Sequence, residues 1–476
     1  MSGNAGKLRG SIGVAAIVFL VLAAASPLTT VAGSLPVMIG LGNGAGAPLA
    51  YIVAALVLLV FSVGYAAMSR SVDETGAFYA YVSKGLGNKL GVGGAALALF
   101  AYTTVQAGVY GLAANAIRSL VVQYGGPDLP WWTWAFVLMA IVGLVGYRNI
   151  DVGAKVLGVL LVLEICAVVV MSTAIFAKGG AAGIDFVSFT PGAFFSGAPG
   201  VAMMFAIGSF VGFEATAIYS EEAKDPRRTV PIATYVAIIV IGVLYAVASW
   251  AVVLAFGSAN VAAAARQDAG GLTFAAATQY VGPVAGPAMA VMLVASLFAA
   301  LLAFHSAVSR YVLALARRGY APNRFSAVHP RHGSPHAGSL LQSASAFLLV
   351  GVFALLDADP VLQLFTWMAG VAIVAILALM ILTSLAIIVY FHRSGADTRL
   401  WHTRIAPVLG CVGLTAIAAL VIDNFDILMG GSTTIAEVFL AIVGMVFVGG
   451  VFVAAAVDGG RIDDAESPPS DADRAR

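Results

Sequence analysis

Long apolar stretches alternate with short polar connections along the whole chain. A helix needs about 20 predominantly apolar residues to cross the hydrocarbon core of a bilayer, and the 476 residues divide into twelve such stretches. The stretches are continuous and rich in Ala, Leu, Val and Gly, whereas the strands of a membrane β-barrel alternate in polarity. The pattern therefore predicts an all-α polytopic membrane protein with twelve transmembrane helices. The predicted spans are 11–42, 48–68, 90–122, 131–147, 151–177, 199–220, 230–256, 283–316, 337–356, 361–391, 405–422 and 434–457.

Two of these spans contain residues that interrupt a helix near its middle. Span 1 contains SPLTTVAGSLP (26–36), in which proline removes a backbone donor and clashes with the preceding turn. Span 6 contains AIGSFVGFEA (206–215), in which Gly208 and Gly212 weaken the helix. The two interruptions are five spans apart. Paired interruptions of this kind indicate a transporter built from inverted repeats, with its binding site between them. The alternative is that these residues only permit kinks or close helix packing.

Composition and charge support a membrane protein and predict its orientation. Hydrophobic residues make up 61% of the chain and charged residues 10%, far from the roughly 25% charged residues of a soluble domain. Only Arg118, Lys178 and Arg266 fall on the side opposite to the other basic residues, so the bias predicts cytoplasmic N- and C-termini. A net charge of +1 indicates no nucleic-acid partner, and two cysteines within predicted spans imply no disulfide framework.

Ionisable side chains inside predicted spans are candidates for function, because an isolated charge at the bilayer centre costs at least about 2.5 to 3.5 kcal/mol. Glu164 in span 5 and Glu214 in span 6 are therefore candidate proton carriers. Glu164 is also a candidate partner of His305 or Arg310 in span 8, or a sodium ligand with hydroxyls such as Ser306. Alternatively, each glutamate is neutral and locks neighbouring helices together.

Three polar residues of span 3 share one helical face. Tyr102, Gln106 and Tyr110 recur every four residues, which predicts either a lining of the transport pathway or polar contacts between helices. The histidines of HPRHGSPH (329–336) lack a zinc-ligand spacing, so no metal site is expected. Neither HExxH nor GxSxG occurs, and the sequence predicts a protein that is not an enzyme.

Three stretches resemble one known family. SFVGFEATAIYSEEAKDPRRTVPIA (209–233) resembles the span 6 signature of the amino acid/polyamine/organocation (APC) superfamily. DETGAFYAYVSKGLG (73–87) is similar to its segment before span 3, and SRYVLALARRGYAPNRFSAVHPRHGSPHAGSL (309–340) is similar to its connection between spans 8 and 9. The resemblance implies a secondary transporter in the cytoplasmic membrane that moves an amino acid or related amine by alternating access, with the bilayer and this small molecule as its partners.

The resemblance also implies a domain organisation and a mode of coupling. The core consists of five plus five helices related as inverted repeats, as in leucine transporters. No cofactor is expected beyond a coupling ion, H⁺ or Na⁺. Proton symport is the first choice, exchange and sodium symport are the alternatives, and a membrane sensor that does not transport is a rival of another class. The oligomeric state stays open. The predicted units are a cytoplasmic N-terminus (1–10), repeat 1 (11–178), repeat 2 (199–391), two peripheral helices (403–457) and a disordered tail (458–476).

Matching positions carry the family's site residues over to this chain. Gly212 and Glu214 match its span 6 glycine and glutamate, TTVAGS (29–34) replaces its Gly-Ser-Gly in span 1, and Glu164 stands where many relatives have a lysine. Gly208 occupies the position of an aromatic lid, which suggests extra room there and leaves Phe210 or Phe205 to cover the substrate. The predicted coupling residues are Glu164, Glu214 and His305. The predicted substrate-binding residues are Thr30, Val31, Ala32, Gly33, Ser34, Gly208, Ser209, Phe210, Gly212 and Glu214.

Overall fold

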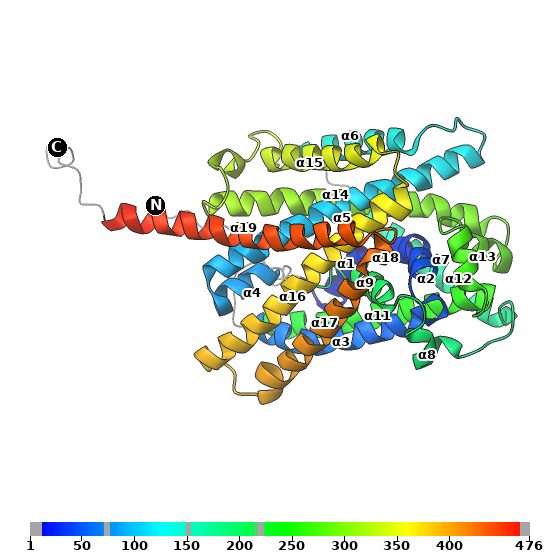
Figure 1. Cartoon of the computed structure of the whole chain (residues 1–476), viewed down its shortest axis with the longest axis horizontal. Helices are drawn as coiled ribbons and strands as arrows, with labels where there is room; N and C mark the ends of the chain where they lie inside the picture. The colour runs from blue at the N-terminus through cyan, green and yellow to red at the C-terminus, as the bar shows by residue number, and fades with distance from the viewer. Residues whose placement is uncertain (1–11, 71–76, 149–153, 215, 217–222, 467–476) are drawn as a thin grey trace.

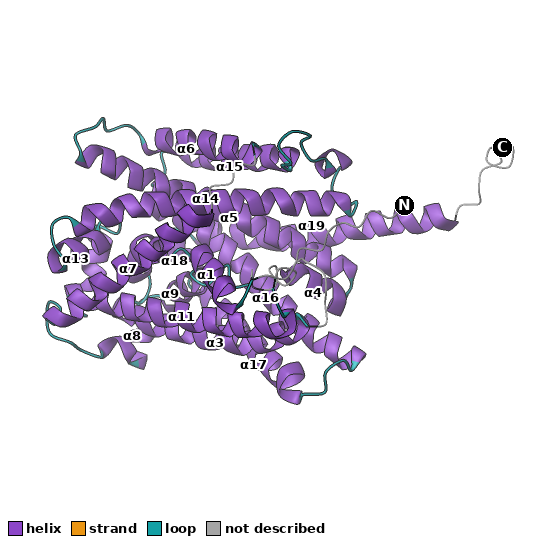
Figure 2. Cartoon of the chain, turned by 180° about the vertical axis from the view of Figure 1, so that it is seen from behind, coloured by secondary structure: helices purple, strands orange, loops and turns teal. Residues whose placement is uncertain are grey.

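The chain folds into a bundle of long helices that run roughly side by side (Figure 1). The structure is a computed structural model, and it describes residues 12–70, 77–148, 154–214, 216 and 223–466. Seen from behind, the described chain is mostly helical, with loops at the two ends of the bundle and short non-helical segments within it (Figure 2). Its one extended pairing among these residues is a parallel bridge between Ile12 and Ala223. The all-α prediction is confirmed.

Within the described residues, ten helices are long and apolar enough to cross a membrane. Two further apolar helices are shorter, and they coincide with the predicted span 131–147 and with the first half of the predicted span 199–220. The first half of the chain forms α1 (Val14–Ala25), η1 (Thr29–Ser34), α2 (Leu35–Leu41), η2 (Gly44–Gly46), α3 (Ala47–Met68), α4 (Ala77–Leu86), α5 (Asn88–Gln123), α6 (Trp131–Tyr147), α7 (Ala154–Lys178), η3 (Val187–Phe189), α8 (Pro191–Phe194) and α9 (Pro199–Gly208).

The second half continues the bundle and adds two short helices, α12 and α13, to a connection for which the sequence predicted no element. These two helices lie at the right-hand end of the bundle in Figure 1, and α4 lies at the opposite end. We call these the α13 end and the α4 end. The elements are α11 (Pro226–Phe256), α12 (Val261–Gln267), α13 (Leu272–Tyr280), α14 (Ala285–Arg317), η5 (Asn323–Ser326), α15 (His336–Leu355), η6 (Pro360–Phe365), α16 (Thr366–Ser394), η7 (Trp401–Ile405), α17 (Ala406–Asp423), α18 (Phe425–Leu428) and α19 (Thr433–Glu466).

The first span is interrupted at Ser26. This residue ends α1 with φ 48° and ψ 74°, in the left-handed region, because the following Pro27 disfavours the α conformation of the residue before it. The helix then resumes, and Thr29–Ser34 forms a wider π-helical turn that leads into α2. The predicted interruption is thus confirmed. It lies at Ser26, the first residue of the predicted segment 26–36, whereas TTVAGS (29–34) remains helical.

The sixth span is interrupted more completely. Helix α9 ends at Gly208, and residues 209–214 form consecutive turns. Gly212 has φ 112°, a conformation that L side chains rarely adopt, and an added Cβ would lie 3.0 Å from the Cβ of Ala24 in α1. The glycine is therefore required both for the backbone angle and for the close approach of the first span. The second predicted interruption is confirmed at its predicted position.

Glycines also allow the central helix α5 to pack closely on its neighbours. A Cβ at Gly111 would lie 2.4 Å from the carbonyl oxygen of Pro360. A Cβ at Gly450 of α19 would lie 2.9 Å from the Cα of Gly93. Outward faces of the bundle carry large apolar side chains such as Phe452, which is 69% exposed. An apolar surface of this extent fits lipid better than water.

Helix α19 corrects the predicted boundary of the C-terminal tail. The sequence predicts a disordered segment from residue 458, but α19 continues to Glu466. Two consecutive glycines at 459 and 460 weaken a helix without ending it, and the first prolines, which do end helices, come only at Pro468 and Pro469. The rest of the predicted tail, 467–476, and the predicted N-terminal segment 1–10 lie outside the described residues.

Candidate functional site

Each helix interruption lies against a buried carboxylate. Glu164 of α7 is 3% exposed, and its Oε2 accepts a hydrogen bond of 3.3 Å from the backbone N–H of Leu28. Pro27 has no N–H, so Leu28 carries the first N–H after the break at Ser26, one of the donors that the start of a helix leaves without a helical partner. A carboxylate at this position also complements the positive end of the helix dipole. Glu164 therefore caps the second half of the first span.

Three hydroxyl groups gather beside this carboxylate. Ser296 of α14 lies 2.6 Å from Ser26 (Oγ to Oγ) and 3.3 Å from Thr29 Oγ1, and it also interacts with Glu164. Ser26 and Thr29 are 3.0 Å apart. One carboxylate and three hydroxyls can hold a proton in a hydrogen-bonded network, and oxygen groups of this kind also suit a hard cation. The network joins α1, η1, α7 and α14.

The predicted contact between Glu164 and His305 of α14 is wrong. His305 turns away from this network, and its Nε2 lies 2.7 Å from Oγ of Ser339 in α15. Its ring also packs where α6 has Gly146, since a Cβ there would lie 2.4 Å from the histidine. The hydroxyl that reaches Glu164 belongs to Ser296, whereas the sequence suggested Ser306. His305 therefore connects α14 with α6 and α15 and does not meet Glu164.

Glu214 is held by three hydrogen bonds at the second interruption. Its Oε2 accepts from the Gly212 N–H at 2.8 Å, and its Oε1 accepts from the Tyr102 hydroxyl of α5 at 2.9 Å. The hydroxyl of Tyr65 in α3 donates to the Glu214 carbonyl oxygen at 3.0 Å. The side chain is 4% exposed. These bonds fix the non-helical turn to two helices that are distant in sequence.

Aromatic side chains fill the space between this turn and the α4 end. Tyr65 packs on Tyr81 and Phe78 of α4, with ring centroids 5.0 and 5.6 Å apart. Phe213, which lies inside the turn, is 6.1 Å from Phe61 and 6.4 Å from Phe78. All five rings are at most 3% exposed. Among the described residues, five packed rings therefore fill this side of the breaks.

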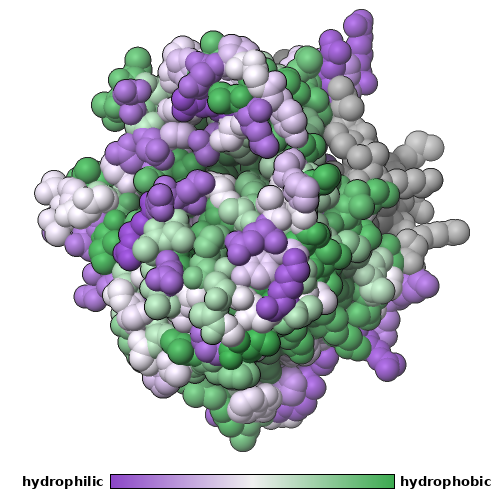
Figure 3. All heavy atoms as spheres, turned by 90° about the vertical axis from the view of Figure 1, so that its right-hand side faces the viewer, coloured by the Kyte–Doolittle hydropathy of each residue, from purple (hydrophilic) through white to green (hydrophobic). Residues whose placement is uncertain are grey.

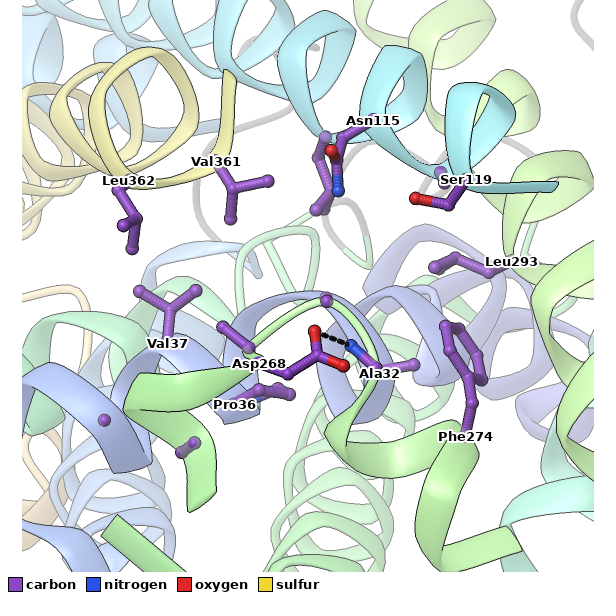
Figure 4. Close-up of a pocket in the computed structure, with 18 of the residues that line it drawn as sticks. Ala32, Pro36, Val37, Asn115, Ser119, Asp268, Phe274, Leu293, Val361 and Leu362 are labelled. Carbon is purple, nitrogen blue, oxygen red and sulfur yellow. Dashed lines mark hydrogen bonds between the residues drawn. The ribbon is translucent and has the colours of Figure 1, made fainter. Parts of the chain in front are cut away.

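A cavity of about 550 Å³ opens on the other side, at the α13 end. It lies between α2, α5, α12, α13, α14 and η6, and it reaches Ala32 and Gly33 of the first span. In the close-up, Asn115 and Ser119 of α5 lie across the cavity from Pro36 and Val37 of α2 (Figure 4). Viewed from this end, the surface mixes polar with apolar side chains (Figure 3). A solute entering from the α13 end would meet the first span at Ala32 and Gly33, six and seven residues after the break at Ser26.

The predicted substrate-binding residues of span 1 occupy two kinds of position. Ala32 and Gly33 line the cavity. Thr30 is 4% exposed and its hydroxyl donates to the Ala25 carbonyl, while Ser34 donates to the Thr30 carbonyl. The Val31 carbonyl accepts from Thr273 of α13 at 2.7 Å.

The predicted substrate-binding residues of span 6 do not line this cavity. A Cβ at Gly208 would lie 3.1 Å from Ile373 of α16, so the extra room predicted at this position is absent because Ile373 fills it. Phe210 is fully buried against Tyr245 of α11, and Ser209 donates to the Phe205 carbonyl. Phe205 stacks on Phe365 of η6 at 6.2 Å. Because Val361 and Leu362 of the same short helix line the cavity, Phe205 is the better placed of the two predicted covers.

The three polar residues of span 3, Tyr102, Gln106 and Tyr110, differ in their contacts. Tyr102 reaches the break through Glu214. Gln106 donates to the Leu301 carbonyl of α14 at 3.2 Å, accepts from Gln342 of α15, and donates to the Tyr110 hydroxyl at 3.4 Å. The bonds with Leu301 and Gln342 join α5 to α14 and α15, whereas the bond with Tyr110 lies within α5. Ser296 and Tyr65 are site residues that were not predicted, since neither differs locally from the many other polar residues in membrane helices.

Membrane-length helices, two of them interrupted beside buried carboxylates, define a multi-pass membrane protein of the transporter class. The chain belongs to the amino acid permease family, whose model matches residues 16–458. The resemblance seen in the sequence is thereby confirmed. The chain is 26% identical to the low-affinity putrescine importer PlaP of Escherichia coli over 359 residues. These residues cover 72% of this chain and 75% of the importer.

Two other relatives carry different names. The branched-chain amino acid permease BcaP of Bacillus subtilis is 24% identical over 359 residues, which cover 71% of this chain and 74% of the permease. An uncharacterized transporter of Mycobacterium tuberculosis is 33% identical over 136 residues, which cover 29% of this chain and 30% of that protein.

Proposed function

We propose that the chain is a secondary transporter that carries an amino acid or a related amine across the cytoplasmic membrane by alternating access. The observation that supports this function best is that both broken spans lie beside buried carboxylates, with a cavity on one side and packed aromatic rings on the other. A solute bound between the breaks would have access to one side only. The names of the putrescine importer and the branched-chain permease agree with an amine or amino acid as substrate.

The proposed architecture follows the two breaks. α1 to α2, α3, α5, α6 and α7 form the first block of five spans, and α9 begins the second, which ends with α16. α17 and α19 are the two peripheral spans. The distribution of lysine and arginine supports cytoplasmic termini, which makes the α4 end cytoplasmic and the α13 end extracellular.

Glu164 is the proposed coupling residue. A buried carboxylate is costly in a membrane unless a proton or a cation neutralises it. Since Glu164 binds the backbone directly after the first break, its charge state acts on the segment that must move when access alternates. Neutralisation by a proton gives proton symport. Neutralisation by Na⁺, with the hydroxyls of Ser26, Thr29 and Ser296 as further ligands, is the alternative.

The test is uptake into proteoliposomes that contain the purified protein. Labelled amino acids and amines are offered with an imposed pH gradient, then with a sodium gradient. With Glu164→Gln we expect gradient-driven accumulation to fall by about tenfold or more, because the amide cannot exchange a proton. Exchange of internal for external substrate should persist.

The matched control is Glu437→Gln, because Glu437 is exposed on the peripheral helix α19. It should accumulate substrate like the wild type. Unchanged pH-driven accumulation in Glu164→Gln would rule out Glu164 as the proton carrier. Accumulation by the wild type that follows only the sodium gradient would favour sodium symport.

A further inference from the structure

The polarity of the cavity changes along its depth. Leu112 of α5 lines the cavity where it is buried, at 5% exposed, and its Cδ2 would lie 2.7 Å from a Cβ at Gly33 of the first span. Asn115 lies one turn further along the same helix. Its Nδ2 would lie 3.5 Å from a Cβ at Gly270, in the connection between α12 and α13. Ser119 and Gln123 continue this face towards the mouth, where both are exposed. The cavity therefore has an apolar floor and a polar mouth.

None of the described residues that form the floor is charged. Ala32, Leu112 and Leu293 are at most 5% exposed, and Gly33 and Phe274 line the same cavity. We call these five residues the apolar floor. A buried ammonium group needs a partner of opposite charge. The two buried carboxylates beside the breaks, Glu164 and Glu214, already accept hydrogen bonds from the backbone there.

The charged residues of the cavity lie at its mouth. Arg266, Asp268 and Asp359 are all exposed. Asp268 accepts a hydrogen bond from the Gly271 N–H at 2.8 Å, drawn dashed in Figure 4. Asp359 accepts from the N–H groups of the first turn of η6. Water screens charges in such positions, so they cannot replace a carboxylate on the floor.

Taking the proposed transport function as given, we propose that the transported solute is an amino acid with an apolar side chain, and not a diamine. The charged α-amino and α-carboxylate groups would remain at the breaks, and the side chain would lie on the apolar floor. Burial of an apolar side chain there is favourable, whereas the second ammonium group of a diamine would lose its water without gaining a partner. Of the two substrate types named for the relatives, the apolar floor favours the branched-chain amino acids.

The first experiment measures selectivity in proteoliposomes. Labelled leucine and labelled putrescine are each offered, and alanine, valine, leucine, phenylalanine, lysine and putrescine serve as competitors. We expect leucine uptake to be inhibited by apolar amino acids at concentrations about tenfold or more below that of putrescine, as expected for a site that cannot pair a second cation. Putrescine uptake that leucine does not inhibit would overturn the inference and leave the transport function intact. Uptake of neither compound, nor of any competitor when labelled, would instead overturn the transport function.

The second experiment changes the depth of the floor. In Gly33→Ala the new Cβ would force the flexible end of Leu112 towards the cavity. The apparent KM for leucine should rise by about tenfold while that for alanine changes by less than about twofold, because only the larger side chain needs the lost space. Adding Leu112→Val should restore the value for leucine.

Gly351→Ala in α15 is the matched control, since no atom lies within 4 Å of the added Cβ, and it should leave both KM values unchanged. If Gly33→Ala does not fold, Leu112→Ala alone tests the same surface: it should improve phenylalanine relative to alanine as a competitor. Equal effects on small and large amino acids in all these variants would refute a role of the floor in selectivity.

Discussion

The hydrogen bond from Tyr102 to Glu214 can be removed with almost no change in shape. In Tyr102→Phe the ring keeps its packing on Phe304 and Tyr311, at centroid distances of 6.2 and 5.9 Å, and only the hydroxyl is lost. Glu214 Oε1 then loses its 2.9 Å donor in a buried environment. The perturbation therefore isolates one bond between α5 and the turn that follows α9.

The size of the effect follows from the nature of the acceptor. A hydrogen bond contributes about 1.5 to 3 kcal/mol when one partner is charged and about 0.5 to 1.5 kcal/mol when both are neutral. Each 1.4 kcal/mol corresponds to about tenfold in an equilibrium constant. The population in which residues 209–214 are open should therefore rise by at least a few-fold, and by about tenfold or more if Glu214 is charged.

Amide hydrogen exchange measures this population directly. In Tyr102→Phe, the amides of 209–214 should exchange faster by a few-fold to about tenfold, since exchange reports local opening. They include the Gly212 N–H, which donates to Glu214. Tyr65→Phe, which removes the donor to the Glu214 carbonyl, should act in the same direction. Tyr124→Phe at a 70% exposed position is the control. Unchanged exchange in the first variant would show that Tyr102 does not hold the turn.

Two further substitutions test the backbone and the helix packing. Gly212→Val should reduce substrate affinity by about tenfold or more, because a β-branched residue is strained at φ 112°; a dissociation constant equal to that of the wild type, from equilibrium binding to the purified protein, would contradict this. Gly450→Leu should lower the melting temperature in detergent, since the added side chain meets α5 and overpacking costs about 1 to 3 kcal/mol. Gly444→Leu on the same helix, with no atom within 4 Å of its added Cβ, should change it far less.

The parts of the fold that depend on local chemistry could be predicted from the sequence. Pro27 disfavours the helical conformation of Ser26, and Gly212 is a residue that can adopt the positive φ seen in the turn 209–214, so both breaks could be predicted from the residues themselves. The helices themselves follow from continuous apolar stretches. By contrast, α12 and α13 were missed because their alanine-rich segments, 261–267 and 272–280, are too short to show as spans.

The partners of the buried carboxylates depend on long-range packing and could not be predicted. Glu164 and Leu28 are 136 positions apart, and no local pattern specifies that contact. Ser296 and His305 lie on the same helix, and the rotation of α14 decides which of them faces Glu164. The same limit explains the error at Gly208, because the space left by a missing side chain is filled by Ile373, which is distant in sequence.

The two glutamates differ in what their charge can control. Glu214 binds the N–H two residues before it, so its carboxylate closes its own turn, and its links to other helices run through the hydroxyls of Tyr102 and Tyr65. Glu164 lies on α7 and binds the backbone of the first span directly. A proton on Glu164 therefore weakens a bond that joins α7 to the backbone of the first span, whereas a proton on Glu214 weakens a bond within its own turn and a bond to the Tyr102 side chain of α5. For this reason we propose Glu164, and not Glu214, as the residue that couples an ion to the movement of a broken helix.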